Sequence, residues 1–584
     1  MKGFDVLNIK SAVKARNKMT YNYSHLTTMD IGQIAPLCAI DCIAGDNDFE
    51  VDANLFSRVA PLVRPTYGKF KLKTMAGYVP YHMIAADAEA WLDGKTSWEG
   101  YTPLHRYFTF GTLMSFLLDP SISTTTGATQ ANCDFTHVAS GTRRYDLFTK
   151  KGKYFIKVLN ALGYAIPSDV DLTNGTSWHT NERVRKLSAY PLLCFFKLYN
   201  DYMSQSQRFN TSQLSNILNA VKYGKAYSGI WTNTTGEILS GGLLAMFNSL
   251  LVNYENDYFT SAWQSANAPL ANVENVSQVT VPVSSGVVIN DTLQDQQAGL
   301  VATGGSAILP QRVLDFLRSF DNWVRRNNYS GSRAVQQVFS RFGIKTSDYR
   351  EHYAHIYGVD EFPVQVGDVT SQSDATGAVL GDFAGKGIVA GSKTFHFNAD
   401  DHGMFFILGF YTVTPMNPYG FDRRVLRTEP LDYYNPEFDG LGADAISVGE
   451  FYADPLDETG AVADSSTFGF TERYNSYRYM RDVITGDFRN YRNNADMNVW
   501  HSGRNLSAVR AAGQLLAQNS AVNTMPQTDS EYNRIFNYTY SDVDHFYLTC
   551  QFRVSAVRPM LNLNQVVGLG EGNLAVPRNG NVVS

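Results

Sequence analysis

The sequence predicts a mainly β fold, in which antiparallel strands form a sandwich and helices lie in long insertions between the strands. Residues 546–554, near the C-terminal end, alternate apolar and mostly polar side chains, which is the period of a strand with one buried face. Residues 69–73 alternate in the same way near the N-terminal end. Residues 404–414 (MFFILGFYTVT) form a continuous apolar run, which fits a strand that is covered on both faces.

Three stretches between these strands carry apolar residues at helical spacing. One follows Pro310 and runs to Val324, one covers residues 335–342 with Ser332 before it and Gly343 after it, and one covers residues 191–203. Because strands open and close the chain, many contacts must join segments that are distant in sequence, as in a Greek-key sandwich.

We expect a single domain, residues 1–584, with large insertions. No repeat of solenoid length and no long Pro, Gly or Ser linker divides the chain. The candidate insertions 121–150, 205–256 and 265–310 are rich in Ser, Thr, Asn, Gly and Gln, so we predict loops or surface excursions there. Residues 1–22 are predicted to form a basic N-terminal arm.

The composition favours large contacts between proteins. Aromatic residues make up 13% of the chain, with 34 Tyr and 35 Phe, whereas charged residues make up only 18%. Rigid aromatic rings bury a large area at a low entropic cost. The formal net charge of −6 means that any contact with nucleic acid must be local or shared with a separate basic partner.

The cysteines and the first residues predict a protein that folds in a reducing compartment. Five cysteines are scattered without zinc-finger spacing, and we expect them to be reduced and buried. The first 19 residues contain no apolar core of a secretory signal, and no segment approaches the length of a membrane span.

Motifs for nucleotide binding and nucleophilic catalysis are weak. Residues 381–387 (GDFAGKG) resemble a phosphate-binding loop, but three residues separate the glycines where four are required, so we predict a structural turn. Residues 568–572 (GLGEG) have no predicted helix after them. No G-x-S-x-G motif occurs. We therefore expect neither a catalytic site nor a cofactor.

Two histidine clusters could supply metal ligands, but we do not predict a metal. His352 and His355 lie three residues apart, and the glutamate at 351 precedes both, so the H-E-x-x-H order is absent. The second cluster lies beside the apolar strand and contains His396, Asp400, Asp401 and His402. A surface loop or a subunit contact is the preferred interpretation of each cluster.

Two basic regions are candidate contacts for single-stranded nucleic acid or for neighbouring subunits. The first is the acid-free segment 6–29, which contains Lys10, Lys14, Arg16 and Lys18 and is either an arm that contacts phosphates or an ordinary solvated arm. The second, residues 468–492, interleaves arginines with aromatic residues: Arg473, Tyr474, Tyr477, Arg478, Tyr479, Arg481, Arg489 and Arg492. Rings can stack on unpaired bases and arginines can bind phosphates, but subunit interfaces have the same composition and are the favoured interpretation.

Several segments together resemble the major capsid protein of the Microviridae, and of the gokushovirus-like members in particular. They occur in the family's order along most of the chain: SHLTT at 24–28, AGD at 44–46, VPYHMI at 79–84, a helix that ends in YND at 199–201, DYFTSA at 257–262, DHG at 401–403, LDYYNPE at 431–437, GDFR at 486–489 and RPM at 558–560.

The sequence also departs from the family pattern at two places. Apolar residues 192–195 stand where the family has an arginine after the helix proline, and DYFTSA continues as WQS instead of a proline-rich stretch. These differences indicate a divergent subgroup with surface loops of its own.

The resemblance implies an eight-stranded antiparallel jelly roll with long insertions between its strands. It implies a major capsid protein that self-assembles in the host cytoplasm into a T=1 icosahedral shell around a circular single-stranded DNA phage genome. The partners it implies are other copies of the chain, the genome, a small basic DNA-packaging protein, a pilot or minor spike protein and a host surface receptor.

Two other functions stay open at this point. A carbohydrate-binding or adhesin-like β sandwich would use the many aromatic rings to stack on sugars, although it should carry an export signal. A metal-dependent hydrolase would use one of the two histidine clusters.

Overall fold

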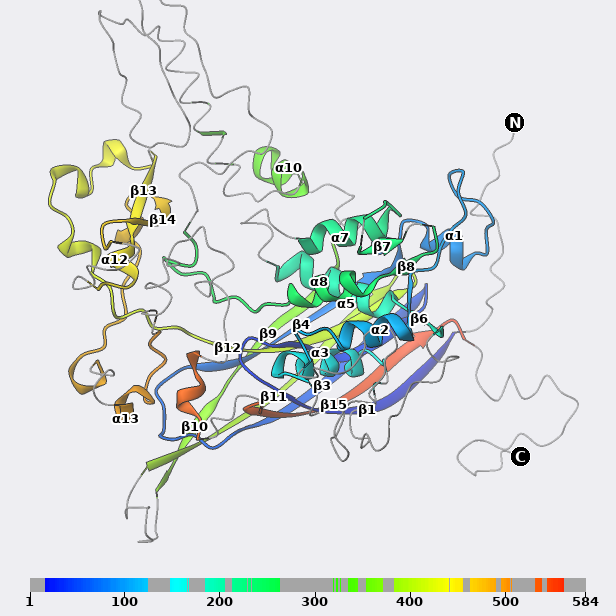
Figure 1. Ribbon diagram of the computed structural model, residues 1–584, viewed down its shortest axis with the longest axis horizontal. Coiled ribbons are helices and arrows are strands. Elements are labelled where there is room, and N and C mark those ends of the chain that lie inside the picture. Colours follow the sequence, from blue (N-terminus) through cyan, green and yellow to red (C-terminus); the bar gives the residue numbers. More distant parts are fainter. Residues whose placement is uncertain are drawn as a thin grey trace, which may run out of the picture.

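The computed structural model of this chain consists of two antiparallel sheets with a layer of helices over one of them (Figure 1). It describes residues 16–123, 148–164, 184–204, 213–262, 334–344, 353–370, 383–454, 463–489, 495–506, 531–537 and 543–560, apart from single positions inside these ranges and a few isolated positions outside them. No helix in this part of the chain is long and apolar enough to cross a membrane.

The two sheets combine strands from both ends of the chain, as the sequence predicted. The five-stranded sheet has the order β1 (Asn17–Met29), β15 (Phe546–Arg558), β3 (Asp46–Val59), β11 (Phe383–Ala399) and β10 (Gln365–Thr370). The four-stranded sheet has the order β2 (Ile34–Cys42), β12 (Gly403–Val413), β4 (Phe70–Pro80) and β9 (His355–Pro363). Every pair of neighbours in these two sheets is antiparallel.

Strand β12 is buried along its whole length because it lies between two hydrophobic cores. Phe405 and Ile407 face the core between the two sheets, whereas Phe406 and Leu408 face the core under the helices. Successive side chains of a strand point to opposite faces, so a strand with two covered faces needs an unbroken apolar sequence. This confirms the prediction of a doubly covered strand at 404–414.

Strand β15 contacts only the core between the sheets. Phe546, Leu548, Cys550 and Phe552 are buried in that core, and the residues between them are exposed or half-buried. Among the described residues, no helix covers the outer face of the five-stranded sheet, and the predicted alternation of β15 is confirmed.

The helical layer comes from the chain between β4 and β9. It contains α1 (Ala88–Leu92), α2 (Phe110–Leu117), α3 (Lys150–Ala161), α5 (Tyr190–Tyr202), α7 (Gln213–Lys222), α8 (Ser240–Asn248) and a small sheet of β5 (Tyr107–Thr109), β6 (Lys186–Ser188), β7 (Trp231–Thr232) and β8 (Glu237–Ile238). Thr109 and Thr149 cap α2 and α3, since their hydroxyls accept hydrogen bonds from the backbone N–H groups of Thr112 and Gly152.

Two of the three predicted helices can be compared with the structure, and both are confirmed. Helix α5 starts one residue before the predicted 191–203, and α10 (Ala334–Phe342) ends before Gly343, whose φ of 68° suits glycine at the end of a helix. Most of the helix predicted between Pro310 and Val324 lies outside the described residues, as do Ser332 and residues 568–572.

The prediction of loops at 205–256 is wrong for the described part of that segment. Helices α7 and α8 lie there, and Ile217, Val221, Leu243 and Phe247 are buried in the core under the helices. Their helical spacing was hidden by the Asn, Ser, Thr and Gly residues between them. Most of the other two predicted insertions, 121–150 and 265–310, lies outside the described residues.

The glycine-rich segment 381–387 is not a turn from residue 383 onward, because it forms the start of β11 and pairs with β10. On the other side of β11, a Cβ atom at Gly387 would lie 2.6 Å from Cγ2 of Val59 on β3, so glycine at this position lets β11 approach β3 closely. The predicted arm is shorter than 1–22, since residues 17–22 already belong to β1.

A separate outer module, residues 421–489 where described, has a hydrophobic core of its own and lies beside the sandwich (Figure 1). Its elements are a hairpin of β13 (Ala443–Ser447) and β14 (Thr467–Glu472), helix α12 (Val448–Phe451) and the 3-10 helices η4 (Arg423–Val425), η5 (Pro430–Asp432), η6 (Pro436–Phe438), η7 (Asn475–Tyr477) and η8 (Gly486–Phe488). Tyr258 and Phe259, which follow the helical layer, pack in this third core.

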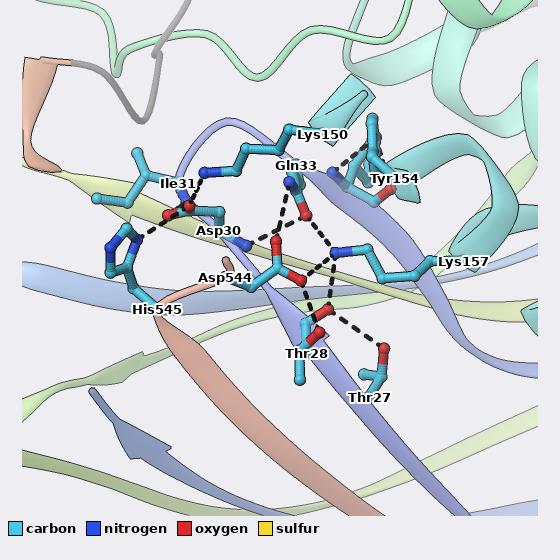
Figure 2. A network of polar contacts seen from close by, with 11 residues as sticks. Thr27, Thr28, Asp30, Ile31, Gln33, Lys150, Tyr154, Lys157, Asp544 and His545 are labelled. Atoms are coloured by element: carbon cyan, nitrogen blue, oxygen red, sulfur yellow. Dashed lines mark hydrogen bonds and ion pairs between the residues drawn. The ribbon is translucent and has the colours of Figure 1, made fainter. Parts of the chain in front are cut away.

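A buried polar network joins the two terminal strands to the helical layer (Figure 2). Asp30 follows β1 and has no exposed surface; it lies 2.5 Å from Nζ of Lys150 on α3 and 3.0 Å from Nδ1 of His545, which precedes β15. Lys157 of α3 pairs with Asp544 at 2.6 Å, and Thr28 donates a hydrogen bond to the same carboxylate. One set of charges therefore connects three segments that are far apart in sequence.

We expect Asp30→Asn to lower the free energy of unfolding by about 3 kcal/mol or more, because it removes the charge of a fully buried carboxylate that pairs with Lys150 and contacts His545. Urea unfolding of the purified subunit measures the change. The matched control is Asp93→Asn, whose carboxylate is 60% exposed and pairs with Lys95, and which should change stability by about 1 kcal/mol at most. Equal effects of the two substitutions would contradict a structural role for the network.

The Asp544 carboxylate should make the fold sensitive to acid. Burial opposes its charge, but Lys157, with help from Thr28, outweighs burial and holds the pKa of Asp544 below its usual value. A carboxyl group whose folded pKa is depressed stabilises the fold above its unfolded pKa of about 3.9, and that stabilisation is lost as the pH falls toward the folded pKa. We therefore expect Asp544→Asn to destabilise the subunit at pH 7 more than at pH 3, as measured by thermal unfolding at both pH values.

Candidate functional site

The candidate site is the surface of the outer module, where the structure gathers most of the predicted arginine and tyrosine residues. Arg473, Tyr474, Tyr477, Arg478 and Tyr479 follow β14 directly, in and around η7. The backbone turns sharply at this point: Tyr474 adopts a left-handed φ of 62°, and its N–H donates to Asp444 Oδ2 at 3.0 Å. Arg481 and Arg489 lie farther along the same segment, whereas Arg492 lies outside the described residues.

Exposed apolar side chains are concentrated on this module. An aromatic ridge, defined here as Leu431, Tyr433, Tyr434 and Phe438, projects from η5 and η6 with exposed fractions of 36–54%. The ridge is fixed from below, since the Tyr434 ring lies 5.2 Å from that of Tyr474 and its backbone N–H donates to the Tyr477 hydroxyl at 3.1 Å. Exposed apolar groups held in a defined shape are typical of a protein contact surface.

Beside the ridge lies a cavity of about 340 Å³. Five aromatic residues and four arginines contribute to its walls, and the complete lining is Tyr258, Phe259, Phe421, Asp422, Arg423, Arg424, Arg427, Glu450, Ser476, Tyr477, Tyr479, Met480, Arg481 and Val483. Tyr258 and Tyr479 stack with their centroids 4.9 Å apart, and Phe259 packs against both rings. The cavity thus opens between the third core and the segment after β14.

The four arginines of the cavity have different partners. Arg423 pairs with Glu450 at 2.7 Å, and Arg424 pairs with Asp422 at 2.7 Å. Arg427 has no carboxylate partner among the described residues; its guanidinium lies over the Tyr477 ring at 3.8 Å and donates to Ser476 Oγ. Arg481 donates to the backbone carbonyls of Asn417 and Gly420 and likewise pairs with no described carboxylate.

The ionisation states of these groups follow from their surroundings. The Arg424 guanidinium holds the pKa of the Asp422 carboxyl below its usual value, so Asp422 is charged at neutral pH. Burial raises the pKa values of the Tyr258 and Tyr479 hydroxyls, which therefore stay protonated. The lining of the cavity thus combines four arginines with two carboxyl groups, those of Asp422 and Glu450.

The structure does not bring the two predicted basic regions together. Arg16 and Lys18 lie at the start of β1, at the other end of the molecule from the outer module in Figure 1. Both side chains are exposed. Lys10 and Lys14 lie outside the described residues.

The metal clusters suggested by the sequence do not form as such in the described part of the chain. His352 lies outside it, and His396 belongs to β11, where it pairs with Glu50 in the strand register. Asp401 instead meets His82 at 3.0 Å, with Glu89 nearby, and these three are a group that could hold a metal ion. Nothing in the sequence linked His82 and Glu89 to this turn, because only the pairing of β4 with β12 places them beside it.

The sequence also missed most of the cavity, because only Tyr477, Tyr479 and Arg481 of its 14 lining residues were predicted contact residues. Arg423, Arg424 and Arg427 were not among the predicted contact residues, although the chain from 423 to 434 is also rich in arginine and tyrosine, with three arginines followed by two tyrosines. That shared composition was the available signal. Tyr258 reaches the cavity only through the packing of the third core.

Comparison with known proteins identifies the family. The sequence model of the family described as capsid protein (F protein) matches residues 7–98 and 315–567, which is more than half of the chain. Capsid protein VP1 of Chlamydia phage 1 is 22% identical over 591 aligned positions, which cover 91% of this chain and 94% of that protein. Capsid protein VP1 of Bdellovibrio phage phiMH2K is 29% identical over 178 positions, 29% of this chain and 32% of that protein.

The family match includes both terminal strands of the sandwich and the whole outer module, whereas the helical layer falls almost entirely in the interval between the two matched segments. The exposed surface described above is therefore carried by the part of the chain that the family shares. From this match we conclude that the chain belongs to the capsid protein (F protein) family.

Proposed function

We propose that this chain is the major subunit of a small icosahedral shell, assembled from identical copies in the host cytoplasm around a circular single-stranded DNA genome. As a capsid protein it is a component of the virion, and it acts by self-association and not as an enzyme. What we propose beyond that role is the icosahedral symmetry of the shell, the genome inside it and the surfaces through which subunits make contact.

The sheet order supports an eight-stranded jelly roll as the framework of that shell. Numbered in chain order without the short β10, the main strands β1, β2, β3, β4, β9, β11, β12 and β15 form one sheet in the order 1-8-3-6 and another in the order 2-7-4-5. Strands from the two ends of the chain are neighbours in the first sheet, and consecutive strands alternate between the sheets in the first half. Two interleaved Greek keys produce this arrangement.

The observation that carries the proposed self-association is the aromatic ridge. Tyr433 is 54% exposed and Leu431 is 52% exposed, although both residues lie on a module whose own core is well packed. Leaving such side chains in water is unfavourable unless another surface covers them. In a shell of identical subunits, that surface belongs to a neighbouring copy, and closure by rotation requires contacts between unlike patches.

The proposed division of the chain follows from the same framework. The jelly roll and the outer module form one capsid domain, residues 1–584. The insertion between β4 and β9 adds the helical layer, and this insertion contains the candidate segments 121–150, 205–256 and 265–310. The basic residues before β1 form an arm. Because the chain has a net charge of −6, we also infer that a small basic protein neutralises much of the genome. A pilot or minor spike protein and a host receptor complete the expected partners.

Assembly of a ridge variant tests the proposal. We expect Tyr433→Ser to leave the unfolding temperature of the subunit unchanged, because the side chain is exposed, and to reduce the yield of closed particles at least tenfold. Electron microscopy and sedimentation of the assembly reaction measure that yield. Tyr223→Ser is the matched control, since Tyr223 is 53% exposed on the helical layer, outside the ridge.

A normal yield of closed particles from Tyr433→Ser would show that the ridge is not a contact between subunits. Wild-type protein that remains monomeric under every assembly condition would contradict self-association itself.

A further inference from the structure

We propose that the cavity of the outer module binds one unpaired nucleotide, with the base against its rings and the phosphate at its arginines. This inference rests on the proposed function, because the nucleotide belongs to the enclosed genome. The inference names the class of ligand that the cavity binds, because the formation of a shell does not by itself require such a cavity.

The aromatic part of the cavity suits a nucleobase. Tyr477 is 47% exposed and already carries the Arg427 guanidinium over its ring at 3.8 Å, so a flat cationic and aromatic surface is in place before any ligand arrives. Unpaired bases bind proteins by stacking on such rings and on guanidinium planes. A volume of about 340 Å³ lies at the small end of the range for ligand pockets, and we expect it to admit one nucleotide.

The charge of the cavity suits a phosphate. Its lining contains four arginines and two carboxylates, which leaves two positive charges (4 − 2 = 2). Arg423 and Arg424 form direct ion pairs, whereas Arg427 and Arg481 form none with a described carboxylate. Asp432 acts on Arg427, and Asp422 acts on Arg481, only at longer range. This excess is local, because the chain as a whole has a net charge of −6. A site with unneutralised arginines in an acidic protein favours an anionic ligand.

The same two arginines also have unused hydrogen-bond donors. Arg427 Nε and Arg481 Nη2 are buried and have no acceptor among the described residues. A buried donor without an acceptor costs free energy, so the arrangement is incomplete as it stands. Both arginines line the cavity, so an anion held there would meet their guanidinium groups.

A carboxylate from a neighbouring subunit is the main competing occupant. It would neutralise Arg427 or Arg481, but it would leave the rings of Tyr477 and Phe421 without a stacking partner. A nucleotide satisfies the charge and the rings together, and the observations therefore favour it. The two occupants are distinguished by the measurements below.

The test measures binding of a fluorescein-labelled ten-residue oligo(dT) to the purified, unassembled full-length chain by fluorescence anisotropy. We expect Tyr477→Leu to weaken binding at least about fivefold, and Tyr477→Phe, which keeps the ring, to bind like the wild type. The matched control is Phe56→Leu. Phe56 lies on β3, is 38% exposed and also has an arginine, Arg58, near its ring.

A salt titration gives a second readout that a purely structural effect would not change. We expect Arg427→Gln to reduce the slope of log affinity against log salt concentration by about 0.7, the value for one phosphate contact on a single strand. The control Arg58→Gln should leave the slope unchanged. Thymidine monophosphate in excess should compete with the oligonucleotide if one nucleotide fills the cavity, and inorganic phosphate should compete less well.

Two outcomes would overturn the inference. One is oligo(dT) binding that Tyr477→Leu and Arg427→Gln leave intact. The other is a loss of particle formation in Arg427→Gln with normal oligonucleotide binding, which would assign the cavity to a neighbouring subunit. In either case wild-type particles that contain DNA would still support the proposed shell, whereas the absence of any particles would contradict the shell itself.

Discussion

The fold depends on the pairing of the first strand with the last. β1 and β15 pair over their full lengths, from Asn17 opposite Arg558 to Met29 opposite Phe546, and β15 also pairs with β3. The Asp30 carboxylate, buried at the end of this pair, binds Lys150 of the helical layer and His545 at the start of β15 (Figure 2). Because a buried carboxylate is unfavourable without polar partners, these contacts hold the two chain ends and the insertion in one arrangement.

That constraint divides the molecule into parts with different tasks. The core between the sheets and the core under the helices share β12, so the helical insertion is packed onto a framework formed by distant strands. The outer module has a third core and a surface with exposed rings. A rigid framework with a separately packed contact module is a reasonable design for a shell subunit, because contact surfaces must keep their shape while they remain exposed before assembly.

We propose two roles for arginine and tyrosine on this module. On the ridge, tyrosines present flat apolar surface with a polar edge, which suits a protein contact. In the cavity, Arg427 lies over Tyr477 and forms no direct ion pair with a described carboxylate. Composition alone could not separate the two roles, because interfaces and single-stranded nucleic acid sites use the same residues. The difference lies in which arginines have carboxylate partners.

The sequence by itself determined the strands at 69–73, 404–414 and 546–554 and the helices at 191–203 and 335–342, because local periodicity records which faces are buried. It also indicated, through ordered motifs, the capsid family that the comparison later identified. It did not determine that α7 and α8 are helices, that residues 383–387 form a strand, or that Arg427 lies over Tyr477. Those features depend on contacts between residues far apart in the chain, and only the packed tertiary structure brings such residues together.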